Sequence, residues 1–168
     1  AFRGCGGITN AVIGTGVTVI GEWAFHDDTG LTGVMIIPPG VTRIGIGAFS
    51  GCEGLTHVSI PCSVTSVAYK AFCGCRAMFN VDAASASFNS RDGVLFDKKL
   101  TRLIAYSGSR TGDYTIPDSI TEIGEWAFAG CTGLTGITIP DSVTRIGEWA
   151  FAGCSGLTGI TIPGSVTH

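Results

Sequence analysis

The amino-acid sequence predicts a solenoid, a rod of stacked coils that share one hydrophobic core. The first observation is a tandem repeat, since residues 116–138 are followed at once by a near-copy, 139–161, that differs at only three positions. The second is glycine content, 26 of 168 residues, about twice the usual share, which suits a tight bend in every coil. A unit this short buries its apolar face only by stacking on a neighbour. We therefore expect one long repetitive surface and no deep pocket.

Each repeat contains an apolar run such as Leu157-x-x-Ile160-x-Ile162. This spacing matches the L-x-x-L-x-L core of leucine-rich repeats, in which the apolar side chains point into the coil. Parallel stacking of these strands should give one continuous sheet along the solenoid. A second apolar pair, Val143 and Ile146, should line the opposite wall.

A phenylalanine recurs in the Ala-Phe pair of each unit and should point inside. The segment around it is rich in Ala and Gly, which predicts a 3₁₀ turn or a single helical turn. The column comprises Phe2, Phe25, Phe49, Phe72, Phe128 and Phe151. The step from Phe25 to Phe49 exceeds the regular repeat by a single position, and the surplus residue falls within Leu31–Pro38. An insertion in a strand predicts a β-bulge there.

One long unit breaks the period. We divide the single domain, residues 1–168, into regular repeats at 1–81 and 115–168 and an irregular repeat at 82–114. Within the irregular repeat, apolar runs at 94–96 and 103–106 flank a charged segment, which predicts a β-hairpin projecting from, or extending, one coil. Six of the ten basic residues fall between positions 76 and 110, so this is the least uniform part of the surface.

Residues 139–163, IPDSVTRIGEWAFAGCSGLTGITIP, are similar to the repeat of the BspA-like leucine-rich-repeat proteins. Residues 81–106 resemble the longer variant unit of such arrays. The resemblance implies a right-handed solenoid of the α/β class, mostly β, with a parallel sheet on one face and short turns or 3₁₀ segments on the other. From the repeat count we expect about seven coils. The resemblance also implies secreted or surface-displayed proteins that adhere to host matrix or other surface proteins.

Composition excludes several functions. The net charge is −3, so a nucleic-acid partner is not expected. Mean hydropathy is high, at +0.40, yet the uncharged stretch at 4–21 is dominated by Gly and Thr and would make a poor membrane-spanning helix. No signal peptide is visible and the chain starts and stops within repeats, so we expect a fragment of an extracellular or surface protein.

Five of the seven cysteines share one repeat column, three positions after the phenylalanine, where Asp28 replaces them in one coil: Cys5, Cys52, Cys75, Cys131 and Cys154. Strand spacing of about 4.8 Å would permit disulfides between neighbouring coils. A ladder of buried free thiols is the favoured interpretation, because cysteine is among the most buried residue types. Cys62 and Cys73 lie outside the column, and no zinc-site spacing is present.

No catalytic motif surrounds any of the three histidines, so we expect no enzyme, cofactor or metal site. Trp23, Trp126 and Trp149 share a column with Gly47 and Lys70, which indicates that the indoles are partly exposed. Shielding of neighbouring turns is the plainer role for them, and contact with a ligand is the alternative. The candidate binding residues lie on the sheet face, in the irregular repeat and in the tryptophan column: His57, Phe79, Asn80, Asp82, Arg91, Lys98, Lys99, Arg102, Trp126 and Trp149.

The function hypothesis is a non-enzymatic adhesion or protein-binding module, which binds a host, matrix or surface protein through the sheet face and the irregular repeat. A first alternative is a structural module that self-associates through coils without polar caps. A second alternative is carbohydrate binding by exposed tryptophans.

Overall fold

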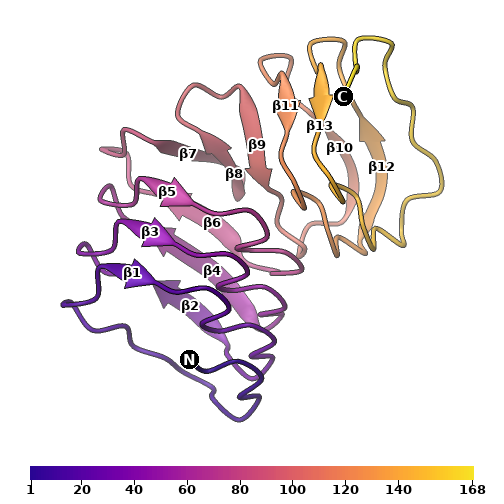
Figure 1. The fold of residues 1–168 in the computed structure, drawn as a ribbon. Helices are drawn as coiled ribbons and strands as arrows, with labels where there is room; N and C mark the ends of the chain where they lie inside the picture. Colours follow the sequence, from indigo (N-terminus) through magenta and orange to yellow (C-terminus); the bar gives the residue numbers. More distant parts are fainter.

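The computed structural model describes residues 1–168 and contains 13 β-strands and no helix. The strands form a solenoid of about 6 turns, with the two ends of the chain at opposite ends of the molecule (Figure 1). The leucine-rich-repeat solenoid with parallel sheets is confirmed. Because every element is a strand, the α/β class implied by the resemblance is corrected to all-β, and seven coils is a slight overcount.

Each regular coil has two walls. The long-strand wall follows the L-x-x-I-x-I pattern and comprises β2 (Gly33–Ile36), β4 (Leu55–Ile60), β6 (Met78–Val81), β10 (Gly112–Thr115) and β12 (Leu134–Thr138). The short-strand wall comprises β1 (Val19–Ile20), β3 (Arg43–Ile44), β5 (Ser66–Val67), β11 (Glu122–Ile123) and β13 (Arg145–Ile146). Neighbouring regular coils pair in parallel on both walls.

The pattern of buried residues in the long strands places the core between the walls. In β4, the inward residues Leu55, Val58 and Ile60 are buried, while Thr56 and His57 are exposed. The inward position of the apolar residues is therefore confirmed. The β-branched and polar residues between them suit the solvated face of a sheet.

The corner around the Ala-Phe pair consists of short turns, one of the two expected forms, and contains no 3₁₀ helix. Within Gly45–Cys52, the N–H groups of Ala48 and Ser50 donate to the carbonyls of Gly45 and Gly47, at 3.2 and 3.1 Å. The intervening N–H of Phe49 instead donates to Ala71 O of the next coil, at 2.8 Å. Because every second N–H is directed at a neighbouring coil, the run of consecutive local bonds that defines a helix cannot form.

The predicted bulge is confirmed. The register of β2 against β4 shifts between Gly33 and Val34, and Gly33 adopts a φ of 76°. Glycine takes this left-handed conformation without steric cost. Gly33 pairs with Leu55 and Val34 with His57, so the residue left without a partner at the shift is Thr56 of β4. Beyond the shift, Met35 is buried while Val34 and Ile36 are 58% and 68% exposed.

The long unit is built into the core and does not project from it. It contributes three antiparallel strands, β7 (Phe88–Arg91), β8 (Val94–Asp97) and β9 (Arg102–Ala105). The predicted hairpin is the β8–β9 pair. Strand β7 was not predicted, although the Asp92-Gly93 dipeptide that joins it to β8 is a strong hairpin signal: both residues have positive φ, of 49° and 75°, as a type I′ turn requires.

Strand β8 divides the core in two, because its neighbouring side chains point to opposite sides. Leu95 packs into an N-terminal cluster of 23 buried residues. Val94 and Phe96 pack into a C-terminal cluster of 14. All three are at most 1% exposed.

The long-strand wall is consequently split, and the prediction of one continuous sheet is wrong. The wall forms one sheet of β2, β4 and β6 and another of β10 and β12. The short-strand wall is split as well, into β1-β3-β5 and β13-β11-β9-β8-β7. The coils therefore form two stacks, an N-terminal stack of β1–β6 and a C-terminal stack of β10–β13. Figure 1 shows the two stacks set at an angle, with β7–β9 between them.

Candidate functional site

Two of the candidate residues on the sheet face lie close together. His57 of β4 and Asn80 of β6 are both exposed, and Asn80 is the register partner of Ser59. Asp82 is also exposed, and its carboxylate accepts a hydrogen bond from the N–H of Ala84 at 2.9 Å, so it closes a turn after β6.

The assignment of Phe79 to the exposed face is wrong. Phe79 pairs in register with Val58, is 3% exposed and contacts Phe72 edge-on, with ring centroids 4.8 Å apart. The expectation assumed a constant repeat step, which would pair His57 with Asn80, but His57 pairs with Met78. The coil that runs from β4 to β6 is therefore shorter than the regular repeat, and this shortening moves Phe79 from an outward to an inward position.

The basic residues of the long unit form no single cluster. Arg91 lies at one end of the β7–β8 pair, whereas Lys98 and Lys99 follow β8 at the other end. Arg102 forms an ion pair with Glu122, whose Oε1 lies 3.3 Å from Nε. Arg91, Lys98 and Lys99 are exposed and form no ion pair.

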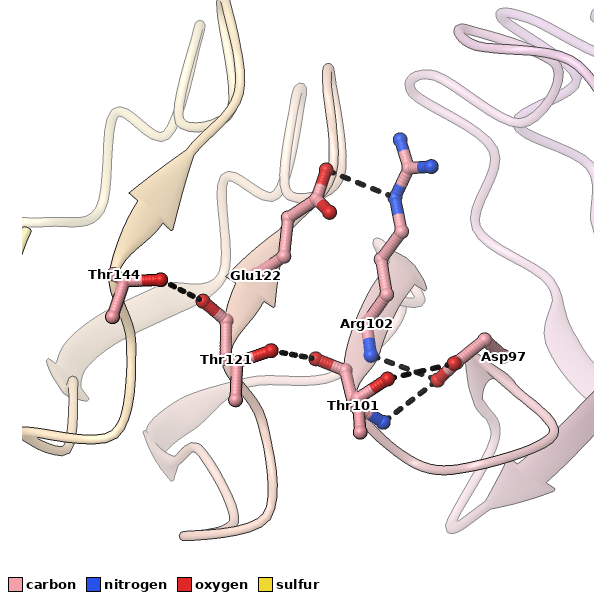
Figure 2. Close-up of polar contacts among 6 residues, drawn as sticks. All are labelled: Asp97, Thr101, Arg102, Thr121, Glu122 and Thr144. Atoms are coloured by element: carbon pink, nitrogen blue, oxygen red, sulfur yellow. Dashed lines mark hydrogen bonds and ion pairs between the residues drawn. The ribbon is translucent and has the colours of Figure 1, made fainter. Parts of the chain in front are cut away.

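Asp97 fixes the turn that presents the two lysines. Figure 2 shows its carboxylate accepting hydrogen bonds from the N–H groups of Thr101 and Arg102, at 2.7 and 2.8 Å, and from Thr101 Oγ1 at 2.8 Å. A threonine ladder continues from there: Thr121 Oγ1 donates to Thr101 O, and Thr144 Oγ1 to Thr121 O, each at 3.3 Å. The turn is thereby tied to the regular coils.

The tryptophan column is a column of left-handed backbone. Trp23, Gly47, Lys70, Trp126 and Trp149 have φ values of 54°, 60°, 63°, 58° and 56°. The presence of Gly47 was the available sequence signal, since positive φ favours glycine. The partial exposure predicted for the indoles is confirmed: Trp149 is 64% exposed and the other two are half-buried.

Trp126 and Trp149 contact each other, and Lys70 lies near both Trp126 and Trp23. Trp126 and Trp149 stack with centroids 5.5 Å apart at an interplanar angle of 16°. Lys70 Nζ lies 4.2 Å from the ring centroid of Trp126 and 5.4 Å from that of Trp23. Cation–π attraction of this kind is worth on the order of 0.5–1 kcal/mol at exposed sites. Trp126 thus contacts Lys70 and Trp149, which leaves Trp149 with the most accessible ring.

A shallow cleft of about 250 Å³ opens where the two stacks meet, between β5 and β9. We call it the junction cleft. Its charged lining residues are Lys70, Asp97, Arg102 and Glu125, and the other lining residues include Thr65–Ala68, Tyr69, Ala71, Phe72, Phe88, Ile104, Ala105 and Trp126. No sequence pattern within one repeat predicts this cleft, because it arises from the interruption of the array.

The seven cysteines are free thiols. The buried ladder is confirmed for Cys52, Cys75 and Cys131 of the repeat column, whereas Cys154 is half-buried and Cys5 is exposed. Cys52 Sγ donates to Phe25 O of the preceding coil at 2.9 Å, and Cys154 Sγ to Phe128 O at 3.0 Å. Burial raises the pKa values of Cys75 and Cys131 to about 12. These thiols therefore stay protonated at neutral pH and are poor nucleophiles.

We expect selective alkylation of the native protein. Cys5 and Cys62 are exposed and should react rapidly with iodoacetamide at pH 8, while Cys52, Cys75 and Cys131 should react only after unfolding. Mass spectrometry of peptides from timed quenches measures each site. Rapid labelling of Cys75 in native protein would contradict the buried ladder.

The same thiols make stability depend on alkaline pH. Their folded-state pKa lies above the reference value of 9.0, so unfolding above that pH releases protons. The protonated thiols therefore contribute fully to the free energy of unfolding below pH 9, and this contribution is lost as the pH rises toward 12. We expect the urea midpoint to fall between pH 8 and pH 10.5, and to fall less in the Cys75→Ala/Cys131→Ala variant.

The fold places the protein in the class of leucine-rich-repeat solenoids, with exposed sheet faces, a tryptophan column and the junction cleft between its two stacks. The sequence matches the family model of the BspA type leucine rich repeat region over residues 1–111 and 101–168, in six copies. The chain therefore belongs to the BspA-type leucine-rich-repeat family.

Solved structures agree with this assignment. A leucine-rich repeat protein from Eubacterium ventriosum is 29% identical over 99% of this chain and 50% of its own, with a TM-score of 0.81. A leucine rich cell surface protein from Faecalibacterium prausnitzii is 26% identical, and the match covers 90% of this chain and 59% of that protein, with a TM-score of 0.61. The pneumococcal vaccine antigen PcpA shares the fold, with a TM-score of 0.68. It is 21% identical, and the match covers 90% of this chain and 50% of PcpA. The chain spans about half the length of these structures.

The search of curated proteins found no match. No helix in the structure is long and apolar enough to cross a membrane. The structure also contains no group of three or more His, Cys, Asp or Glu side chains placed to hold a metal ion.

Proposed function

We propose that the chain is a non-enzymatic protein-binding module of a secreted or cell-surface protein, which serves in adhesion to a host, matrix or other surface protein. The observation that carries the proposal is the long unit. It interrupts an otherwise regular array and exposes Lys98 and Lys99 on a turn held by Asp97. A fixed turn loses little conformational entropy on binding, which favours affinity. Membership of the family and likeness to a cell surface protein support the location.

The binding surface consists of the Lys98–Lys99 turn together with the exposed face around His57 and Asn80. Neither lysine is neutralised by an ion pair, so both are available to an acidic partner surface. Attraction between exposed charges is screened by salt, so binding should weaken as ionic strength rises. The overall charge of −3 makes this local cationic turn more selective than a generally basic surface would be.

Charge reversal tests the proposal. We expect Lys98→Glu/Lys99→Glu to weaken binding to a responsive member of a panel of immobilised extracellular-matrix proteins by at least about ten-fold, measured by surface plasmon resonance. The matched control is Arg43→Glu/Arg145→Glu, which makes the same charge change at exposed positions of the regular coils. Equal loss in both variants would refute a specific role for the long unit. Circular dichroism should show both variants folded.

Truncation of the long unit would not be a usable test, since Leu95, Phe96 and Leu103 are buried in the core. Carbohydrate binding by the tryptophans is a weaker candidate. Trp126 is engaged by Lys70 and Trp149, so a sugar would meet one well-exposed ring only, that of Trp149.

A further inference from the structure

The short-strand wall contains an unpaired edge inside the molecule. In the N-terminal stack, Thr42 O accepts a hydrogen bond from the N–H of Thr65, and Ile44 O from that of Ala68, each at 2.9 Å. These bonds join β3 to β5. The equivalent carbonyls of the next coil, Thr65 O and Val67 O, receive no backbone N–H, because β5 pairs with β3 alone.

In the C-terminal stack, the equivalent edge of β11 is paired with the next strand, β13. Thr121 O accepts from the N–H of Thr144 at 2.9 Å, and Ile123 O from that of Gly147 at 2.8 Å. Ile146 N–H points onward and donates to His168 O of the following coil at 3.0 Å. Val67 occupies the same register position relative to β3 as Ile146 does relative to β11. The open edge of β5 therefore presents two carbonyls and one N–H, in the pattern that elsewhere receives a short parallel strand.

This edge lies in the junction cleft. Residues Thr65–Ala68 line one side of it, and Ile104 and Ala105 line the other. The apolar lining, which includes Ala71 and Phe72, suits small or β-branched side chains. The cleft measures about 250 Å³ and is open to solvent, so it admits a short extended segment whose ends continue outside it.

The rim carries two cations and two carboxylates, so charge alone selects neither an anion nor a cation. Lys70 lies over indole rings, Arg102 is paired with Glu122, and Asp97 accepts backbone hydrogen bonds. Apart from the Glu125 carboxylate, which forms no ion pair, the uncommitted groups in the cleft are mainly those of the backbone. Natural edge strands are usually protected by short length, charge, proline or a bulge. β5 is short, at two residues, but Ser66 and Val67 carry no charge, proline or bulge.

We propose that the junction cleft binds an extended peptide segment of a partner protein, which adds to β5 as a further strand. The inference rests on the proposed function, since it specifies the form of the segment that a protein partner supplies. Backbone hydrogen bonds to Thr65 O, Val67 O and Val67 N–H give the affinity, and alternate side chains of the segment enter the apolar part of the cleft. A helix lacks free backbone groups along its length and cannot satisfy this edge.

The probe is an acetylated, amidated peptide with the sequence of Asp141–Glu148, DSVTRIGE, which in the array forms β13 against β11. The peptide is titrated into the ¹⁵N-labelled 168-residue chain and followed by NMR. We expect saturable shifts of the Val67 amide and the Trp126 indole N–H, which both belong to cleft residues.

Two N-methylated peptides provide the matched comparison. Methylation at the Gly147 position blocks the N–H that would donate to Val67 O, and should weaken binding at least about ten-fold. Methylation at the Ile146 position blocks an N–H that points away from β5, and should leave affinity within about two-fold. This pair requires no change in the protein, so misfolding cannot affect the result.

The proposal is overturned if the unmodified peptide causes no shifts at millimolar concentration, if both methylations weaken binding equally, or if the shifts are confined to the terminal coils. Because the probe is synthetic, these failures leave the Lys98–Lys99 surface untouched. Conversely, peptide binding that persists in a Lys98→Glu/Lys99→Glu variant unable to bind the matrix panel would separate the two sites.

Discussion

Replacing Phe49 with alanine should lower the free energy of unfolding by about 3–5 kcal/mol. Phe49 is 0% exposed and lies between Phe25 and Phe72, with ring centroids 5.3 and 5.6 Å away and interplanar angles of 6° and 4°. Truncation removes stacking on both sides and leaves a cavity that the fixed coil spacing cannot close. Urea denaturation followed by tryptophan fluorescence measures the loss.

Phe2→Ala is the matched control for this effect. Phe2 occupies the same repeat column but is 46% exposed and stacks on Phe25 alone, at 5.5 Å. We expect its replacement to cost less than half as much as that of Phe49. Equal costs would mean that the phenylalanine column does not act as a shared core.

Leu95→Ala and Phe96→Ala should destabilise different halves of the protein. Each substitution should cost about 2–5 kcal/mol, since both side chains are at most 1% exposed. Leu95 belongs to the N-terminal cluster and Phe96 to the C-terminal one. We therefore expect faster hydrogen exchange mainly in residues 20–81 for Leu95→Ala and mainly in residues 114–150 for Phe96→Ala, measured by mass spectrometry.

These neighbours serve as each other's control, because both lie on β8 and both lose large apolar side chains. If the two variants gave the same exchange pattern over the whole chain, the core would behave as one unit and β8 would not be a partition. A split pattern would show that the long unit joins two partly independent stacks.

The repeat pattern predicted the interior of each coil well. Leu55, Val58 and Ile60 point inward as the L-x-x-I-x-I spacing requires, and a register shift lies at Gly33–Val34, within the segment that was predicted to contain a bulge. These features are local: they depend on which face of the backbone each residue occupies within one coil. The error at Phe79 has the same origin, since a coil shorter than the repeat places a nominally outward residue inside.

The candidate site was predictable only in part. The exposed basic residues of the long unit could be named from sequence, but the sequence did not show that Arg91 lies at the opposite end of the β7–β8 pair from Lys98. Nor did it show that Lys70, which precedes the long unit, reaches across it to the indole of Trp126 at 4.2 Å. Such contacts depend on which coils are neighbours in space. The irregular unit changes that order, because it does not form a regular coil between Lys70 and Trp126.

By itself, the sequence determined that this chain is a stack of coils with a shared apolar interior, because a short repeating unit has no other way to bury its hydrophobic face. The tertiary structure alone decided where that stack is interrupted. Strand β8 presents Leu95 to one core and Phe96 to the other, and β5 is left with an unpaired edge beside the junction cleft. The physical reason is that hydrogen-bond pairing between strands is a relation between distant segments, which no periodicity within one segment records.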